Sequence, residues 1–581
     1  MNENVIIETT LHGLITLEKK HPYDRVTLDR IDEMYRELLS QYINSNLLLI
    51  AYNQFRIRNL KNLSFVRPQI LIGWMSYNSF PNFHSIALLK IADIVSLAPI
   101  DSESQIDRVP WNPLFDTIFD ILNKLPDGFS PDLFFDNQID GQHYIPKLLE
   151  SAPFPTVAGL CHMYMYNVIK PATKLFDFVM PLSTPFIPYI KKLGHAHVLN
   201  LPFGLNWASF HHVIAVSKQK DIDISITFQP TDLPRKKTHE LLNAFTKKHG
   251  NKYKIFIADN RLNKDEYLDI LKRSRISINV VGVHGPYNYR TCEIINSGAV
   301  LFQHNNLNYP VQTNLSEYLT EGEHYFDFNE FNFEEKLLSL LDETIDLNRI
   351  STAAQNKLAG DYSYEKLYTR LFEELCRVRI DGSNRVSQEE GLFQLGKLYW
   401  GHQNPQLRIG SLMMIDAISR QEKDLQYINL LGIIPSTFST LSTEETSTIL
   451  EFDNALSSGC LNGGYWQLVT HLHSHTSDHI VAIWNYIIAT LELGKVDITA
   501  CHNLLDKIKH INTHDIFDDE KYVINLCIPN QHKEIWPSEK QSKIELELLI
   551  SENQESRSKI YRDFAFKTCE RIIENHTVLA R

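Results

Sequence analysis

The feature that most constrains the fold is a series of short apolar segments that recur between residues 46 and 204. They are nearly continuous in apolar character, which is typical of strands buried on both faces of a parallel sheet. Helical segments such as "HSIALLKI" (84–91) separate several of them, so a doubly wound sheet is predicted. The predicted strands are "NLLLIAY" (46–52), "PQILIGWM" (68–75), "ADIVSLAPI" (92–100), "DLFFDNQ" (132–138), "TVAGLCH" (156–162), "FDFVMPLS" (176–183) and "HVLNLPFG" (197–204).

The strand–helix pattern restarts after "LPFGLNWASF" (201–210), which has no clear period and is predicted to be a hinge. A second parallel sheet of about five strands is expected. Its predicted strands are "ISITFQP" (224–230), "YKIFIAD" (253–259), "RISINVV" (275–281), "AVLFQH" (299–304) and "HYFDF" (324–328). The helix predicted at 364–376 is expected to return toward the first sheet.

From about Val386 the strand pattern stops, and every segment to Arg581 has helical character. "LFQLGKLY" (392–399) fits the first helix of a tetratricopeptide (TPR) repeat, although an irregular helical bundle is the alternative. The predicted fold is therefore α/β, with two Rossmann-like doubly wound domains followed by an all-α, TPR-like domain. The predicted units are an N-terminal helical extension (1–45), two Rossmann-like domains (46–207 and 208–385) and the helical domain (386–581).

The composition and charge of the chain disfavour several classes of protein. The net charge of −13 disfavours non-specific nucleic-acid binding, so no nucleic-acid partner is expected. Seven cysteines without a C-x-x-C pair indicate reduced thiols and no zinc ribbon. The N-terminus lacks a signal-peptide pattern, and no stretch approaches the ~20 apolar residues of a spanning helix. A cytoplasmic protein without a transmembrane segment is expected.

Two consecutive doubly wound domains are expected to bind a ligand at the carboxyl ends of their strands. The helix N-termini of the second domain would offer backbone N–H groups to phosphate. No G-x-G-x-x-G follows a predicted strand, and no G-x-x-x-x-G-K-[ST] occurs. A dinucleotide redox enzyme is therefore disfavoured, and a P-loop is excluded.

Four segments of the second domain form an ordered set. They are "FQPTDLPRKKTHELLNAF" (228–245), "EYLDILKRSRISINVVG" (266–282), "YRTCEIINSGAVLFQHNN" (289–306) and "YLTEGEHYFDFNEFNFEEKLLSLL" (318–341). In this order they resemble the C-terminal half of a GT-B-fold glycosyltransferase of the group-1 or spore-maturation-protein-B-like (CgeB-like) kind. The resemblance runs from about Ile224 to Arg370 and implies the GT-B arrangement, with an acceptor-side first domain and a nucleotide-sugar-binding second domain.

The resemblance implies roles for individual residues. The carboxylate of Glu293 would accept hydrogen bonds from the two ribose hydroxyls of a nucleotide sugar. Lys236 would neutralise the diphosphate with Arg235, and Arg290 would help or pair with Glu293. His162 follows a predicted strand and is a candidate base. The expected nucleotide-sugar-binding residues are Arg235, Lys236, His284, Tyr289, Arg290, Glu293, Ser297 and Gly298.

The sequence departs from the family pattern at Gly285, where many group-1 enzymes carry an acid eight residues before the matching Glu. His284 or backbone N–H groups would then replace that sugar contact. Gln229-Pro230 likewise stands where a Gly-Arg pair is common. The identity of the sugar and the stereochemical outcome are left open by these departures.

Structural roles compete with these assignments. Glu293 could be an acid in the first turn of a helix, and Arg235-Lys236-Lys237 could be a solvated loop. His162 and Asp136 could be structural, and Asp177 is expected to belong to the fold. "HLHSHTSDH" (471–479) lacks the Glu of H-E-x-x-H, so no metal site is predicted.

Three functions remain open. The first is a nucleotide-sugar-dependent hexosyltransferase-type enzyme with no further cofactor. The second is a nucleotide-sugar epimerase of the same fold, and the third is a non-catalytic scaffold. A small acceptor would not need the helices of 386–581, so a protein acceptor bound by that domain is expected, with protein glycosylation at hydroxyl side chains. A bacterial surface or flagellar protein is one such acceptor.

Overall fold

The computed structural model describes most of the chain up to residue 400 and parts of the remainder. The described residues are 3–42, 45–73, 83–97, 108–136 except 114, 144–160, 166–181, 186–201 except 196, 220–230, 233–280 except 259, 287–305, 315–377 except 343, 385–400, 483–484, 487, 490, 496–510, 547, 551 and 554–579.

The first sheet has five parallel strands in the order β2-β1-β3-β4-β5. Its strands are buried along nearly their whole length, which is why their sequences are continuously apolar. The strands are β1 (Gln69–Ile72), β2 (Asp93–Ser96), β3 (Leu133–Asp136), β4 (Thr156–Leu160) and β5 (Phe178–Pro181). The helices between them are α4 (Phe83–Ile91), α5 (Ile118–Leu122) and α6 (Tyr166–Leu175), and α7 (Ile187–Lys192) follows β5.

One of the strand predictions for this domain is wrong, and another is met only in part. "NLLLIAY" lies in helix α3 (Asn46–Asn59), which Ser45 caps by accepting a hydrogen bond from the backbone N–H of Leu48. This helix is buried on most of its surface, so its sequence shows the same unbroken apolar run as a buried strand. In "HVLNLPFG", the described part contributes only an isolated bridge between Val198 and Val179.

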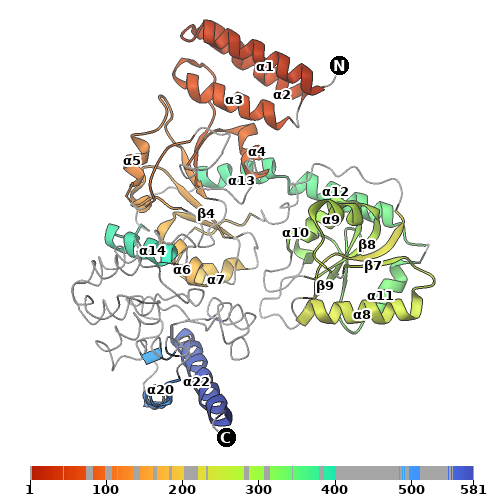
Figure 1. Ribbon diagram of the computed structural model, residues 1–581. Coiled ribbons are helices and arrows are strands. Elements are labelled where there is room, and N and C mark those ends of the chain that lie inside the picture. Colours follow the sequence, from red (N-terminus) through yellow and green to blue (C-terminus); the bar gives the residue numbers. More distant parts are fainter. Residues whose placement is uncertain are drawn as a thin grey trace.

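Helices α1 (Glu3–Lys20) and α2 (Arg25–Gln41) pack with α3 at one end of the molecule (Figure 1). Arg56 of α3 fixes this helical unit to the sheet through buried ion pairs. Its Nη1 lies 2.7 Å from Asp32 Oδ1 on α2, and its Nε lies 2.7 Å from Asp93 Oδ1 on β2. A buried arginine with two carboxylates is fully compensated, so the three elements are held in one arrangement.

The second sheet also has five parallel strands, in the order β10-β9-β8-β6-β7. The strands are β6 (Ile222–Ile226), β7 (Ile255–Ile257), β8 (Ser274–Asn279), β9 (Val300–His304) and β10 (Phe326–Phe328). The helices are α8 (Leu233–His249), α9 (Lys264–Arg273), α10 (Tyr289–Asn296), α11 (Phe333–Leu340) and α12 (Leu347–Asp361). The prediction of two parallel α/β sheets is confirmed.

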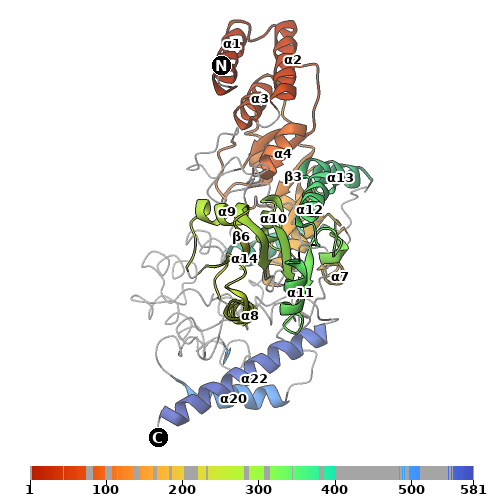
Figure 2. The ribbon, with the colours of Figure 1, turned by 90° about the vertical axis from the view of Figure 1, so that its right-hand side faces the viewer.

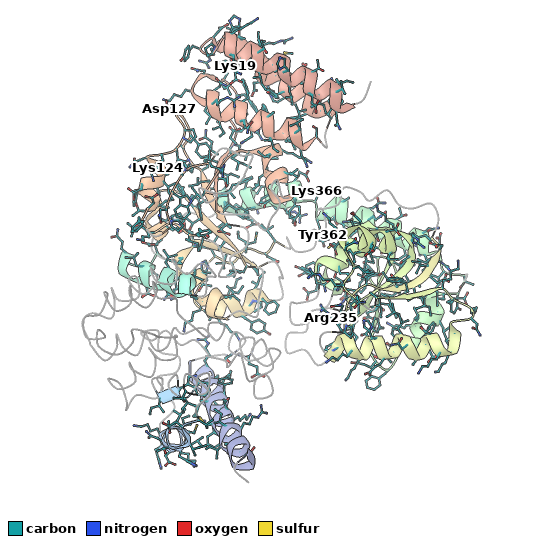
Figure 3. All side chains as sticks on the ribbon, viewed as in Figure 1. Lys19, Lys124, Asp127, Arg235, Tyr362 and Lys366 are labelled. Carbon is teal, nitrogen blue, oxygen red and sulfur yellow. The ribbon has the colours of Figure 1, made fainter. Side chains whose placement is uncertain are left out.

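Helix α13 (Tyr364–Arg377) leaves the second sheet and packs on the first, as expected from the sequence. Its buried residues Leu367, Tyr368 and Leu371 belong to the core of the first sheet, whereas Leu358 of α12 belongs to the core of the second. The chain crosses between the two units from Tyr362 to Lys366 (Figure 3).

Helix α14 (Gln388–Trp400) holds the "LFQLGKLY" segment and packs against α6 of the first domain. Arg385, just before it, binds Asp177 at the start of β5, with 2.8 Å between Nη2 and Oδ2. Asp177 also accepts a hydrogen bond from the Thr156 backbone N–H, so its expected place in the fold architecture agrees with these contacts.

Helices α20 (Ile498–His510) and α22 (Gln554–Leu579) pack on each other near the C-terminal end (Figure 2). Trp484 is buried against Phe564 of α22, with ring centroids 5.4 Å apart. The second helix of the expected TPR repeat and the histidine-rich segment 471–479 lie outside the described residues. No helix in the described parts is long and apolar enough to cross a membrane.

We expect Arg385→Ala to lower the free energy of unfolding by about 1.5–3 kcal/mol, because it removes hydrogen bonds to a buried carboxylate. Urea denaturation would measure the change, and limited proteolysis should show faster cleavage within α14. Arg377→Ala is the control, since Arg377 pairs with Glu374 on the exposed face of α13. Equal stability of the two variants would contradict an anchoring role for Arg385.

Candidate active site

The strand order of the second sheet places a topological switch point between β6 and β8. Counted from β6, the order is 2-1-3-4-5, in which the connections leave the first and third strands toward opposite sides. Ligands of open α/β sheets bind outside the carboxyl ends of the strands at such a switch point. The first turns of α8 and α10 follow β6 and β8 along the chain, so they flank this position.

Three polar residues form a row across the sheet at this edge. Ser225 and Ile226 of β6 pair with Ser277 and Ile278 of β8, so the next position pairs Thr227 with Asn279. Asn279 in turn pairs with Gln303 of β9, and its Nδ2 lies 3.0 Å from Gln303 Oε1. All three are buried. None of the three is among the site residues predicted from the sequence, and their only common sequence signal is a polar side chain close to the end of a buried strand.

Asn279 also fixes the start of α10. Its Nδ2 lies 3.0 Å from Asn288 Oδ1 and 3.1 Å from Thr291 Oγ1. Asn288 is the N-cap of α10 and accepts a hydrogen bond from the backbone N–H of Thr291. The first turn of α10 is therefore held by side-chain hydrogen bonds against β8.

Two arginines converge on the aromatic ring of Phe228, directly after β6. The guanidinium carbon of Arg235 lies 5.8 Å from the ring centroid, and that of Arg290 lies 5.2 Å from it. Arg235 is in the first turn of α8, on the side of the second domain that faces the first (Figure 3). Arg290 is in the first turn of α10 and donates to Asn279 Oδ1 at 3.3 Å.

Cations at these positions oppose the local helix dipoles, because a helix N-terminus already carries partial positive charge. Arg235, Lys236 and Lys237 all lie in the first two turns of α8, and Arg290 is the second residue of α10. The "RKK" run is therefore helical, which corrects its interpretation as a loop. Lys236 and Lys237 are exposed. An anion between the two helix starts would relieve this accumulation of positive charge.

Glu293 lies one turn further along α10 and contacts α9. The Tyr267 hydroxyl donates a hydrogen bond to Glu293 Oε2 at 2.5 Å. Burial raises the pKa of Glu293, while the hydrogen bond from Tyr267 and the charge of Arg290 oppose that rise. No acid occupies the first turn of α10, so the interpretation of Glu293 as a first-turn dipole partner is wrong.

Ser297 and Gly298 lie at the opposite end of α10, where the helix turns into β9. The Ser297 hydroxyl donates to the Ile294 carbonyl at 2.6 Å, and Gly298 has a φ of 76°. Glycine adopts this left-handed conformation without strain, so it ends the helix and allows the tight turn. Ser297 and Gly298 are predicted to bind the nucleotide sugar, but this turn lies about one helix length, ~12 Å, from Arg290.

Several other predicted residues cannot be placed in the site. His162, His284 and Gly285 lie outside the described residues, and so does the side chain of Tyr289, the first residue of α10. Asp136 is buried at the end of β3. A Cβ on Gly73, directly after β1, would lie 2.6 Å from Asp136 Oδ2, so a larger residue there would require Asp136 to move.

Within the part of the chain that the structure describes, no group of three or more His, Cys, Asp or Glu is arranged to hold a metal ion. The charged groups at the β6/β8 edge are instead mostly cations of the protein. Such cations can stabilise the negative charge of a diphosphate directly.

Known proteins are similar to this chain only at low sequence identity. No curated protein matches the sequence. A solved structure of Anabaena Alr3699/HepE with UDP and glucose is 10% identical, covers 54% of this chain and 100% of its own, and has a TM-score of 0.33. A glycosyltransferase from Rickettsia africae ESF-5 is 11% identical, with the same coverage and a TM-score of 0.34. An alpha-glucosyltransferase bound to UDP and a 13-mer DNA gives the same three values as the Rickettsia protein.

The family comparison is confined to one part of the chain. Residues 235–373 match a family described as glycosyl transferase-like. The matched region begins at Arg235 and ends in α13, so it includes α10 and nearly all of the second sheet after β6. The part of this chain that carries Arg235, Arg290 and Glu293 is thus similar to a glycosyl transferase-like domain.

Proposed function

We propose that the protein is a glycosyltransferase that moves a sugar from a nucleotide-sugar donor to an acceptor. One observation carries the proposal. The segment that matches a glycosyl transferase-like family is also the segment that gathers Arg235, Arg290 and Glu293 at the β6/β8 edge. This edge is the binding position of an open α/β sheet.

In the proposed site, the guanidinium groups of Arg235 and Arg290 neutralise the donor diphosphate, with Lys236 adding charge from the exposed side of α8. They stabilise the negative charge that develops on the leaving nucleotide. Glu293, one turn further along α10, accepts hydrogen bonds from the ribose hydroxyls, because a carboxylate can accept two donors at once. The proposed catalytic base is His162, and the proposed sugar contact is His284.

A panel of nucleotide sugars, incubated with the full chain and followed by mass spectrometry, tests this function. A transferase should hydrolyse one donor slowly and release the nucleotide faster when an acceptor is added. An epimerase would convert the donor to its epimer without any acceptor. A scaffold would do neither, and absence of both reactions across the panel would overturn the proposal.

Arg235→Ala and Lys236→Ala are each expected to lower donor turnover about 10-fold, because each removes a charge-assisted hydrogen bond to phosphate. Steady-state kinetics would measure the loss. The matched control is Lys248→Ala at the other end of the same helix, where Lys248 pairs with Glu334. If both variants keep the wild-type rate and nucleotide affinity, the diphosphate binds elsewhere.

We further propose that residues 386–581 recruit a protein acceptor whose hydroxyl side chains receive the sugar. The support is the set of helices α14, α20 and α22 in the described part of this region and its attachment to the first domain through α14 and Arg385. Stacked helices provide extended surfaces that suit polypeptide segments. The domain limits given above, including the boundary at 385, remain part of this proposal.

Labelled donor, the full chain and either a protein extract or free sugars would test the acceptor class. Transfer to polypeptide, located by mass spectrometry on serine, threonine or tyrosine, is the expected result. To test the role of the C-terminal region, a truncated chain should end at Trp400, because α14 packs on α6 of the first domain. Transfer only to free sugars would overturn the protein-acceptor proposal while leaving the transferase intact.

A further inference from the structure

Tyr267 is a residue of the site that neither the motifs nor the expected family roles selected. It lies at the fourth position of α9, whose start is fixed by a capping box between Asn263 and Glu266. Its ring packs against the buried cluster that contains Leu271, Cys292 and Ile295. This packing places the hydroxyl 2.5 Å from Oε2 of Glu293, on α10.

The hydrogen bond has a defined direction. Burial and the negative charge of Glu293 raise the pKa of Tyr267 well above its ordinary value, so the tyrosine remains protonated and donates. Glu293 therefore accepts through one of its two oxygens. Among the described residues, none donates a hydrogen bond to the other oxygen, Oε1.

Two cations, on α10 and at the start of α9, act on this pair. Arg290 of α10 interacts with both Tyr267 and Glu293, and Lys264 at the start of α9 adds positive charge near the carboxylate. Arg290 also lies against Phe228, the residue shared with Arg235. Tyr267 thus lies beside Glu293, which is proposed to bind the ribose, and near Arg290, which is proposed to bind the diphosphate.

We propose that Tyr267 is a positioning residue that orients the Glu293 carboxylate for the vicinal diol of a ribonucleotide. Tyr267 holds Oε2 in place and leaves Oε1 and the remaining lone pair of Oε2 for the two ribose hydroxyls. This inference rests on the proposed nucleotide-sugar site. A carboxylate fixed in this way discriminates a ribonucleotide from a deoxyribonucleotide, because the missing hydroxyl leaves a buried acceptor unpaired.

The test uses the full chain and isothermal titration with UDP, GDP and ADP, followed by the 2′-deoxy form of whichever nucleotide binds most tightly. Wild-type protein is expected to prefer the ribonucleotide. Tyr267→Phe, which keeps the ring, should weaken ribonucleotide binding about 10-fold and leave deoxyribonucleotide binding nearly unchanged. The matched control is Tyr253→Phe, whose ring stacks on Phe245 elsewhere in the same domain.

A double-mutant cycle with Glu293→Gln separates positioning from general support of the fold. If Tyr267 acts through Glu293, the tyrosine substitution should have no further effect once Glu293 is replaced. Equal losses for both nucleotides, or additive losses in the cycle, would overturn the positioning role. If the wild type binds none of the three nucleotides, the proposed function itself fails together with this inference.

Discussion

Replacing Glu293 by alanine is expected to lower donor turnover about 10–150-fold, the largest effect on activity that the site predicts. A lost hydrogen bond to a charged group costs about 1.5–3 kcal/mol, which corresponds to that range. Steady-state kinetics with the donor found in the panel would measure it. Glu240→Ala, at an exposed position of α8, is the control.

The Glu293→Ala protein should remain folded, because α10 is capped independently by Asn288. Circular dichroism and thermal melting would verify this. A variant that is folded and turns over at the wild-type rate would show that Glu293 does not contact the donor.

The raised pKa of Glu293 predicts that nucleotide affinity depends on pH. Burial raises the pKa of Glu293 above its ordinary value of 4.5, so the free protein favours the protonated form at a higher pH than a solvated glutamate would. Ribose recognition needs the ionised form. Nucleotide affinity should therefore fall as the pH falls through this raised pKa, and the loss should begin above pH 4.5. Titrations between pH 4 and 8 would show it, and a flat profile in wild type would contradict it.

Replacing Arg56 by alanine is expected to lower the free energy of unfolding by about 3–5 kcal/mol, the largest effect on stability. The substitution leaves the carboxylates of Asp32 and Asp93 buried, with 1% and 0% of their surface exposed, and without their principal cation. Removing one member of a buried ion pair carries a cost of about this size. It also removes the hydrogen bond from Nη2 to the Phe65 carbonyl at 2.7 Å.

Urea denaturation would measure this change in stability. The control is Arg30→Ala, because Arg30 pairs with Glu33 on the exposed face of α2, where an ion pair contributes about 0–1 kcal/mol. Similar losses for both variants would show that burial of the Arg56 network does not govern the stability of the helical unit. Nucleotide affinity should be nearly unchanged in the folded fraction, since the network lies in the other domain.

The apolar segments predicted most strands correctly because a strand buried on both faces has few polar positions. "PQILIGWM" and "TVAGLCH" contain β1 and β4, and "RISINVV" covers β8 except its first residue, Ser274. The same rule failed at "NLLLIAY", because a helix buried on nearly all sides produces the same unbroken run over seven residues. Local pattern distinguishes burial from exposure more clearly than it distinguishes strand from helix.

The candidate site was predicted unevenly for a related reason. Arg290 and Glu293 lie in a recognisable segment, and their spacing along one helix follows from the sequence alone. Tyr267 lies on a different helix, 26 residues earlier, and its contact with Glu293 exists only because α9 and α10 pack on the same face of the sheet. Ser297 and Gly298 belong to the same segment as Arg290, yet the helix carries them to its opposite end.

By itself, therefore, the sequence determined the two parallel sheets, the helical character of the described C-terminal segments and the helix that carries Arg290 and Glu293, since these depend on apolar periodicity and local motifs. Only the tertiary structure decided which side chains meet. Strand register aligned Thr227, Asn279 and Gln303, and packing brought two arginines to Phe228. It also placed Arg56 between Asp32 and Asp93 and Arg385 against Asp177. Such contacts join residues far apart in the chain, and no local pattern encodes the distance between them.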